Sequence, residues 1–146
     1  MEFLGSKLAI LSGGQVLTML RDDIPGLPYR GEWDLPGGGR EGDELPIDCA
    51  LRETWEETAL RIELRWVVWR RLYPNPRRAD GLPIWMFVAE VPPDELGTPQ
   101  LGDEGQALEW MRVSEFLGHS GAIAHLQAHL QDYLRERSLR EGSAHA

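Results

Sequence analysis

Residues 37–60 read GGGREGDELPIDCALRETWEETAL and hold the densest set of potentially reactive side chains in the chain. The stretch opens with three glycines, and Pro46 then stands where a proline suits the first turn of a helix. Charged residues crowd the second half of that helix. We therefore expect a glycine loop followed by a helix that carries the functional groups.

The expected helix has two distinct sides, because spacings of three and four residues bring side chains together at about 100° per residue. Glu53, Glu56 and Glu57 fall on one side, with Arg52 at its edge. The other side forms a stripe wide enough to bury. Its members are Ile47, Ala50, Leu51, Thr54 and Thr58.

The three neighbouring carboxylates repel one another, and each close pair lowers helix stability by roughly a few tenths of a kcal/mol. A bound cation would offset that repulsion. Ligands that are all oxygen suit a hard ion such as Mg²⁺ or Mn²⁺, whereas zinc favours Cys and His. The alternative is a solvated helix face, since charge runs usually face water.

The spacing around the helix favours the first alternative. Five residues separate the first fixed glycine from the first fixed glutamate, and seven more precede an Arg-Glu pair. This pattern resembles the Nudix box of enzymes that hydrolyse nucleoside diphosphates linked to another group. The matching positions are Gly38, Glu44, Arg52, Glu53, Glu56 and Glu57.

Two positions depart from the family pattern. Ala59 replaces the last glycine, just past the helix, where a left-handed residue is common. If that conformation is kept, a residue other than glycine costs roughly 1–2 kcal/mol. Thr54 stands where the family usually has an aliphatic residue. Neither change removes a carboxylate.

The resemblance implies an α/β fold, namely a Nudix-type α/β/α sandwich with a central mixed sheet. It also implies Mg²⁺ as cofactor, with Mn²⁺ as a substitute. On this basis Glu53 and Glu57 are the expected metal ligands and Glu56 is a ligand or a catalytic base. Arg52 is expected to orient the carboxylates through charge-assisted hydrogen bonds.

A fourth carboxylate is expected from a later loop. Many Nudix enzymes carry a glutamate just before a strand of the kind expected at residues 107–113. Glu104 matches that place better than Asp103 by its distance to Trp110. We therefore expect Glu104 to be a further metal ligand or the base.

Four residues are candidates for contact with the substrate. Arg21 ends an expected strand, where the family has an arginine that contacts phosphate. Gly38 would let the backbone approach an ion or a phosphate. Arg78 lies in the loop 74–81 and could hold phosphate, although that loop also fits a solvated hairpin tip. Trp33 could stack on a base, with packing as the alternative.

The rest of the chain alternates strand patterns with one amphipathic helix. We expect a single domain over residues 1–140 and a disordered tail at 141–146. His125 and His129 are expected on an exposed helix face. The expected strands are 7–12, 15–21, 32–36, 62–73, 82–91 and 107–113, and the expected second helix is 121–137.

Composition restricts the class of protein. A net charge of −9 argues against binding a nucleic-acid polymer, which depends on basic patches. Cys49 is the only cysteine, so no disulfide can form within the chain. No apolar run approaches the ~18 residues of a membrane span, and the N-terminus does not resemble a signal peptide. A cytoplasmic location fits these features.

The sequence therefore predicts a metal-dependent hydrolase that cleaves the pyrophosphate linkage of a nucleoside di- or triphosphate. ADP-ribose and diadenosine polyphosphates are the alternative substrates. A Nudix-fold module that binds nucleotides without turnover is the alternative function. Homodimers are common in the family, and the sequence leaves the oligomeric state open.

Overall fold

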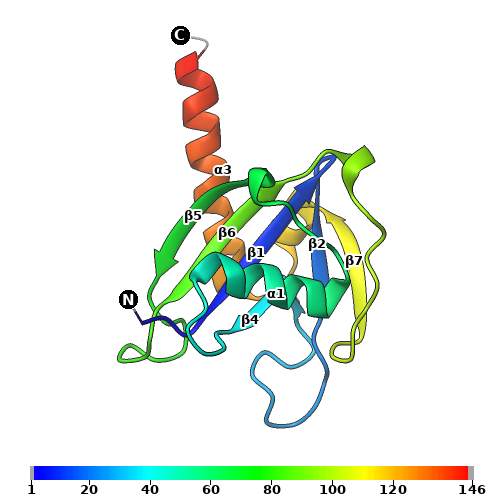
Figure 1. The fold of residues 1–146 in the computed structure, drawn as a ribbon, viewed down its shortest axis with the longest axis vertical. Helices are drawn as coiled ribbons and strands as arrows, with labels where there is room; N and C mark the ends of the chain where they lie inside the picture. The colour runs from blue at the N-terminus through cyan, green and yellow to red at the C-terminus, as the bar shows by residue number, and fades with distance from the viewer. Residues whose placement is uncertain (1, 145–146) are drawn as a thin grey trace.

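The computed structural model describes residues 2–144 and shows a twisted mixed sheet with helices on both of its faces (Figure 1). The strands are β1 (Gly5–Ser12), β2 (Gln15–Leu20), β3 (Trp33–Asp34), β4 (Gly37–Gly39), β5 (Val67–Tyr73), β6 (Ile84–Glu90) and β7 (Ala107–Arg112). The helices are α1 (Pro46–Thr58), α2 (Val113–Gly118) and α3 (Ala124–Ala144). Short 3₁₀ turns occupy Leu64–Trp66 and Pro93–Glu95.

The sheet has the strand order β3-β2-β1-β6-β5, while β4 also pairs with β1 and β7 with β2. β1 and β6 run parallel, and the other pairs are antiparallel. This arrangement confirms the predicted mixed sheet. Gly13 and Gly14 join β1 to β2 with φ values of 56° and 79°, which glycine adopts at no steric cost. The hairpin expected there is therefore confirmed.

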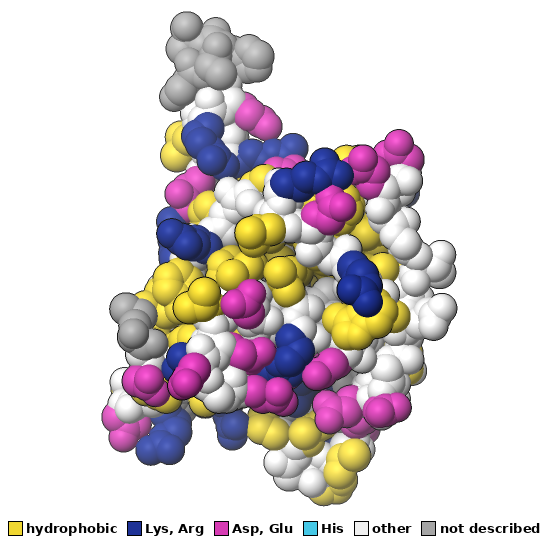
Figure 2. All heavy atoms as spheres, viewed as in Figure 1, with side chains coloured by type: hydrophobic (Ala, Val, Ile, Leu, Met, Phe, Trp, Pro, Cys, Tyr) yellow, Lys and Arg dark blue, Asp and Glu magenta, His cyan; other side chains and the backbone are white. Residues whose placement is uncertain are grey.

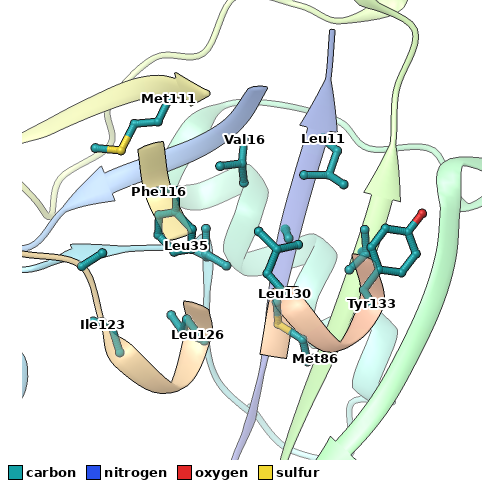
Figure 3. Packing of buried hydrophobic residues seen from close by; sticks show 13 residues of the cluster. Leu11, Val16, Leu35, Met86, Met111, Phe116, Ile123, Leu126, Leu130 and Tyr133 are labelled. Carbon is teal, nitrogen blue, oxygen red and sulfur yellow. The ribbon is translucent and has the colours of Figure 1, made fainter. Parts of the chain in front are cut away.

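The alternation of side chains along β1 separates two hydrophobic cores. Ala9 and Leu11 belong to the core beneath α3, and Leu8 and Ile10 belong to the core beneath α1. In the first core, side chains of the sheet meet α2 and α3 (Figure 3). With helices packed on both sheet faces, the predicted α/β/α sandwich is confirmed.

Helix α1 buries the side that its sequence predicts. Ala50, Thr54 and Thr58 are buried, and Cys49 beside them is buried as well. The Ser6 hydroxyl donates to the Pro46 carbonyl at 2.8 Å and so ties the first turn of α1 to β1. The adjoining side of α1, which carries the carboxylates, therefore has a fixed position relative to the sheet.

Three expected elements differ in extent. The glycines 37–39 form strand β4 against β1 instead of a loop. The strand expected from residue 62 begins only at Val67, because the preceding turn places Trp66 in the core and a bulge follows between Val67 and Trp69. Helix α3 continues past residue 137 to Ala144, where Arg137 pairs with Glu141 at the favourable i, i+4 spacing.

The tail expected at 141–146 is thus helical over 141–144, and residues 145–146 lie outside the described residues. Among residues 2–144, no helix combines the length and the apolar composition needed to cross a bilayer.

The expectation that His129 is exposed is wrong. His129 is only 8% exposed, because it lies on the same side of α3 as the buried residues Leu126, Leu130 and Tyr133. Its ring stacks on Tyr73 with a centroid distance of 3.5 Å. Burial and the neighbouring His125 lower the pKa of His129 to about 4.

The Ala59 site yields a prediction about stability. Ala59 caps α1 with φ 59° and ψ 20°, the left-handed conformation expected from the family glycine. Ala59→Gly should raise the free energy of unfolding by roughly 1 kcal/mol, because glycine removes the steric cost. Ala128→Gly, on the exposed side of α3, should lower that free energy by a similar amount. Urea unfolding of both variants checks this, and two changes of the same sign would contradict it.

Burial of His129 yields a second prediction. Since the pKa is lower in the folded state than the usual value of about 6.5, the unfolded chain binds more protons between pH 6.5 and 4. Stability conferred by the neutral ring is therefore lost as pH falls through this window. Between pH 6.5 and 4, the unfolding free energy of His129→Phe should fall by on the order of 2–3 kcal/mol less than that of the wild type. Equal slopes for the two proteins would contradict this origin.

Candidate active site

Strand β4 crosses the carboxylate side of α1 at very close range. A Cβ at Gly38 would lie 2.7–2.9 Å from the carboxylate atoms of Glu53. A Cβ at Gly37, where φ is 134°, would lie 2.2 Å from the Ser6 carbonyl oxygen. Only glycine lets this backbone lie between β1 and α1. The glycine run is therefore needed for the approach of the strand to the carboxylates.

Two carboxylates one helical turn apart point at this strand. Glu57 Oε1 accepts a hydrogen bond of 2.7 Å from the Gly37 N–H. Burial raises the pKa of Glu57 to about 7, and burial also raises the pKa of Glu53. Burial therefore disfavours the charged form of both carboxylates, and a bound cation would offset that cost.

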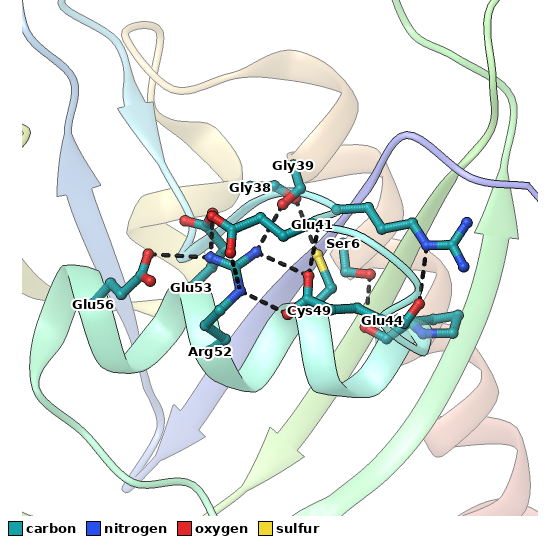
Figure 4. Close-up of polar contacts among 11 residues, drawn as sticks. Ser6, Gly38, Gly39, Glu41, Glu44, Cys49, Arg52, Glu53 and Glu56 are labelled. Atoms are coloured by element: carbon teal, nitrogen blue, oxygen red, sulfur yellow. Dashed lines mark hydrogen bonds and ion pairs between the residues drawn. The ribbon is translucent and has the colours of Figure 1, made fainter.

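Arg52 organises the remaining acidic groups (Figure 4). Its guanidinium donates to both oxygens of Glu44, at 2.6 and 3.0 Å. Its Nη1 also donates to Glu53 at 3.0 Å and to Glu56 at 3.1 Å, and its Nη2 donates to the Gly39 carbonyl at 2.9 Å. Arg52 therefore connects Glu44, α1 and β4 through hydrogen bonds. Its role in orienting the carboxylates for catalysis stays a prediction.

The predicted ligand group is not fully assembled. Glu56 turns toward Arg52, and its side chain is 52% exposed. Over residues 2–144, no three side chains of Asp, Glu, His or Cys converge closely enough to hold an ion. The assignment of Glu53, Glu56 and Glu57 as metal ligands stays a prediction.

The donor set nevertheless fits a hard divalent ion. Glu53 and Glu57 supply carboxylate oxygens beside β4. The Gly38 carbonyl lies 3.4 Å from the Cys49 thiol, a weak donor, and Gly38 also pairs with Ser6 in the sheet. Oxygen ligands of this kind are those that Mg²⁺ and Mn²⁺ prefer. Acidic side chains gather on the face that carries α1 (Figure 2).

The loop that carries Glu104 is fixed at both ends near the helix. Gly102 N–H donates to the Glu57 carbonyl at 3.2 Å, and Gly105 N–H donates to Asp22 at 3.1 Å. Glu104 itself is exposed between these two anchors. In the described part of the chain its carboxylate has no hydrogen-bond or ion-pair partner. Its role as a ligand or base stays a prediction.

A cavity of about 410 Å³ opens beside the glycine strand. Gly38 and Arg21, both predicted to contact substrate, lie in its wall. Apolar side chains from several elements complete the wall, so the cavity has the mixed lining of a small-molecule site. They include Leu4, Pro28, Tyr29, Ile84, Ile123 and Leu126.

Two other predicted contacts lie elsewhere. Arg78 is not among the residues that line this cavity and pairs with Asp80 at 3.4 Å, whereas its neighbour Arg77 lines the cavity. Trp33 packs against the core beneath α3 and lies edge-on to His119, outside the cavity lining. The structure thus replaces Arg78 with Arg77 at the cavity, and it gives Trp33 a packing contact.

Sequence analysis missed Lys7 and Asp34. Lys7 Nζ and Arg21 Nη1 both donate to Asp34 Oδ2, at 3.0 and 2.9 Å, and all three residues line the cavity. A lysine at the start of an apolar strand and an aspartate directly before Leu35 were the available signals. Neither could show that the two side chains meet, because 27 residues separate them.

The chain resembles known proteins along most of its length. A family model described as NUDIX domain matches residues 8–132. A MutT-like protein of Streptomyces ambofaciens is 32% identical over 124 residues, which cover 83% of this chain and 72% of the relative.

Solved structures of similar fold agree. A MutT protein from Methanosarcina mazei Go1 superposes with a TM-score of 0.72 at 20% identity, covering 92% of this chain and 95% of the other. A bifunctional NMN adenylyltransferase/ADP ribose pyrophosphatase of Francisella tularensis, complexed with AMP and a manganese ion, gives a TM-score of 0.77 at 18% identity. That match covers 93% of this chain but only 42% of the larger protein.

The approach of β4 to α1 yields a prediction about metal binding. Gly38→Ala should weaken Mn²⁺ binding by about 10- to 100-fold, because the new methyl group must displace the Glu53 carboxylate. Gly39→Ala is the matched control, since a Cβ there meets no atom within 4 Å. Calorimetric titration of both variants checks the difference. Equal affinities would show that the approach at Gly38 does not shape a metal site.

Proposed function

The chain belongs to the NUDIX family and is a Nudix hydrolase, and from this premise we propose that it cleaves the pyrophosphate linkage of a nucleoside di- or triphosphate with the help of Mg²⁺. The observation that carries this proposal is the meeting of two features at Gly38. The Glu53 carboxylate lies against one side of this glycine, and the cavity that contains Arg21 opens at the same residue.

The chain supplies the groups that such a reaction needs. Glu53 and Glu57, with backbone oxygens of β4, would hold the ion. A bound Mg²⁺ neutralises phosphate charge and lowers the pKa of a coordinated water. Arg21 has donors directed to the cavity and would bind phosphate oxygens. Arg52 keeps Glu53 oriented through its hydrogen bond of 3.0 Å.

The base that accepts a proton from the attacking water is assigned to Glu56 or Glu104. Glu56 is the more accessible carboxylate of α1, and its only partner in the described residues is Arg52. Glu104 is exposed on a loop anchored to the last turn of α1. Each can therefore reach solvent without breaking a buried contact. Loss of turnover with metal affinity retained would identify which of the two is the base.

The cavity favours a compact organic group attached to the phosphates. Its volume of about 410 Å³ and its apolar wall suit a nucleoside. The names of similar proteins support nucleotide chemistry in general, since they include an ADP ribose pyrophosphatase and an Ap4A hydrolase from C. elegans. ADP-ribose and diadenosine polyphosphates are therefore the alternative substrates, and Mn²⁺ is the alternative cofactor.

A substrate panel tests this proposal. Release of phosphate or pyrophosphate would be measured with Mg²⁺ and with Mn²⁺ for nucleoside di- and triphosphates, ADP-ribose, dinucleoside polyphosphates and nucleotide sugars. The double variant Glu53→Gln, Glu57→Gln should lose at least about 100-fold in turnover, because the ion and the charge it neutralises are both lost.

Asp48→Asn is the matched control, since Asp48 is an exposed carboxylate on another side of α1. It should keep the rate of the wild type. An inert wild type that still binds nucleotides would instead indicate a binding module without turnover. Equal loss in the control and the double variant would show that the effect comes from net charge and not from the two ligands.

A further inference from the structure

The carboxylate of Asp34 is the most deeply buried charged group at the cavity. Asp34 is 1% exposed, and its Oδ2 accepts hydrogen bonds from Lys7 and from Arg21. Its Oδ1 accepts the Leu35 N–H at 2.7 Å. Burial of a carboxylate is unfavourable unless it is paired and hydrogen-bonded, and Asp34 meets both conditions. The orientation of Asp34 is therefore strongly fixed.

The two cations beside Asp34 differ in how many hydrogen-bond donors they leave free for a substrate. The ammonium group of Lys7 has three donors, and three acceptors lie within reach, namely Asp34 and the carbonyls of Leu35 and Gly37, at 3.0, 3.2 and 3.1 Å. Arg21 has five donors but uses only Nε, toward the Pro28 carbonyl at 2.9 Å, and one Nη1 donor, toward Asp34. Of these two cations, only Arg21 therefore has donors that the described residues leave free for a substrate.

Lys7 connects this group to the metal side of the site. The Gly37 carbonyl accepts from Lys7, and the Gly37 N–H donates to Glu57. Asp34 thus fixes Arg21 directly, and through Lys7 it is joined to the residue that orients Glu57. A shift of Asp34 would move the phosphate-binding group relative to the carboxylates, and misplacement of about 1 Å can cost on the order of 100-fold in rate.

We propose that Asp34 is a positioning residue of the hydrolase. It holds the guanidinium of Arg21 in the cavity wall so that the free donors meet the substrate phosphates. Together with Lys7, it also fixes the position of these donors relative to strand β4. This inference rests on the proposed function. Lys7, by contrast, directs its three donors at acceptors of the protein and serves as a structural link.

Asp34→Asn tests the role, because the amide keeps the shape of the side chain but removes its charge. Positioning predicts that KM for the best substrate of the panel rises about 10- to 100-fold, since Arg21 is no longer held. If Asp34 acts only through its charge, KM should fall instead, because loss of a negative charge beside two cations favours binding of an anionic substrate. An unchanged or lower KM therefore overturns the inference.

A double-mutant cycle separates positioning from loss of folding. In an Arg21→Ala background, Asp34→Asn should add less than about twofold to KM, because its effect passes through Arg21. Arg21→Lys should resemble Arg21→Ala, since a lysine cannot contact Pro28, Asp34 and a phosphate at once. Independent effects of the two substitutions on KM would show that Asp34 does not act through Arg21 and would overturn the inference. Thermal melting of each variant measures its stability separately.

The affinity for inorganic pyrophosphate in the presence of Mg²⁺ tests the role of Asp34 without requiring turnover, and so separately from the proposed function. If the wild type hydrolyses nothing on the panel, the proposed function fails while the Asp34 assignment is still decided. Weaker pyrophosphate binding by Asp34→Asn than by the wild type supports positioning. Equal or tighter binding overturns it.

Discussion

The close approach of strand β4 to the carboxylate side of α1 is the constraint on which the site depends. Glycine at position 38 leaves the Glu53 carboxylate in contact with the backbone, and Gly37 donates its N–H to Glu57. The same strand pairs with β1 and lines the cavity. One short run of backbone therefore joins the carboxylates that would hold an ion to the space that would hold a substrate.

Arginine side chains complete this arrangement from two directions. Arg52 ties Glu44, Glu53 and the Gly39 carbonyl together on the outer side of β4. Arg21 stands on the cavity side, where Asp34 fixes it. Both guanidiniums spread their donors over a planar fork, a geometry that the compact ammonium group of a lysine does not reproduce. An acidic chain thus places its cations where negative groups must lie close together.

The sequence allowed the sheet pattern, the box helix and its buried stripe to be predicted, because local periodicity encodes them. It could not predict that residues 37–39 pair as a strand, because that pairing depends on a distant partner in β1. Helical spacing places His129 beside Leu126, Leu130 and Tyr133, but its stacking on Tyr73 of β5 could not be predicted from that spacing. Arg78 was the predicted contact in the loop 74–81, but Arg77 is the arginine of that loop that lines the cavity, and the charge of the loop alone could not distinguish the two.

Anomalous diffraction from crystals grown with Mn²⁺ and methylenediphosphonate, a pyrophosphate analogue that cannot be hydrolysed, tests the central claim most directly. We expect a manganese peak bound by Glu53 and Glu57 beside the β4 backbone, with the phosphonate oxygens between that ion and Arg21. Manganese bound away from these two carboxylates, or a phosphonate that avoids Arg21, would contradict it.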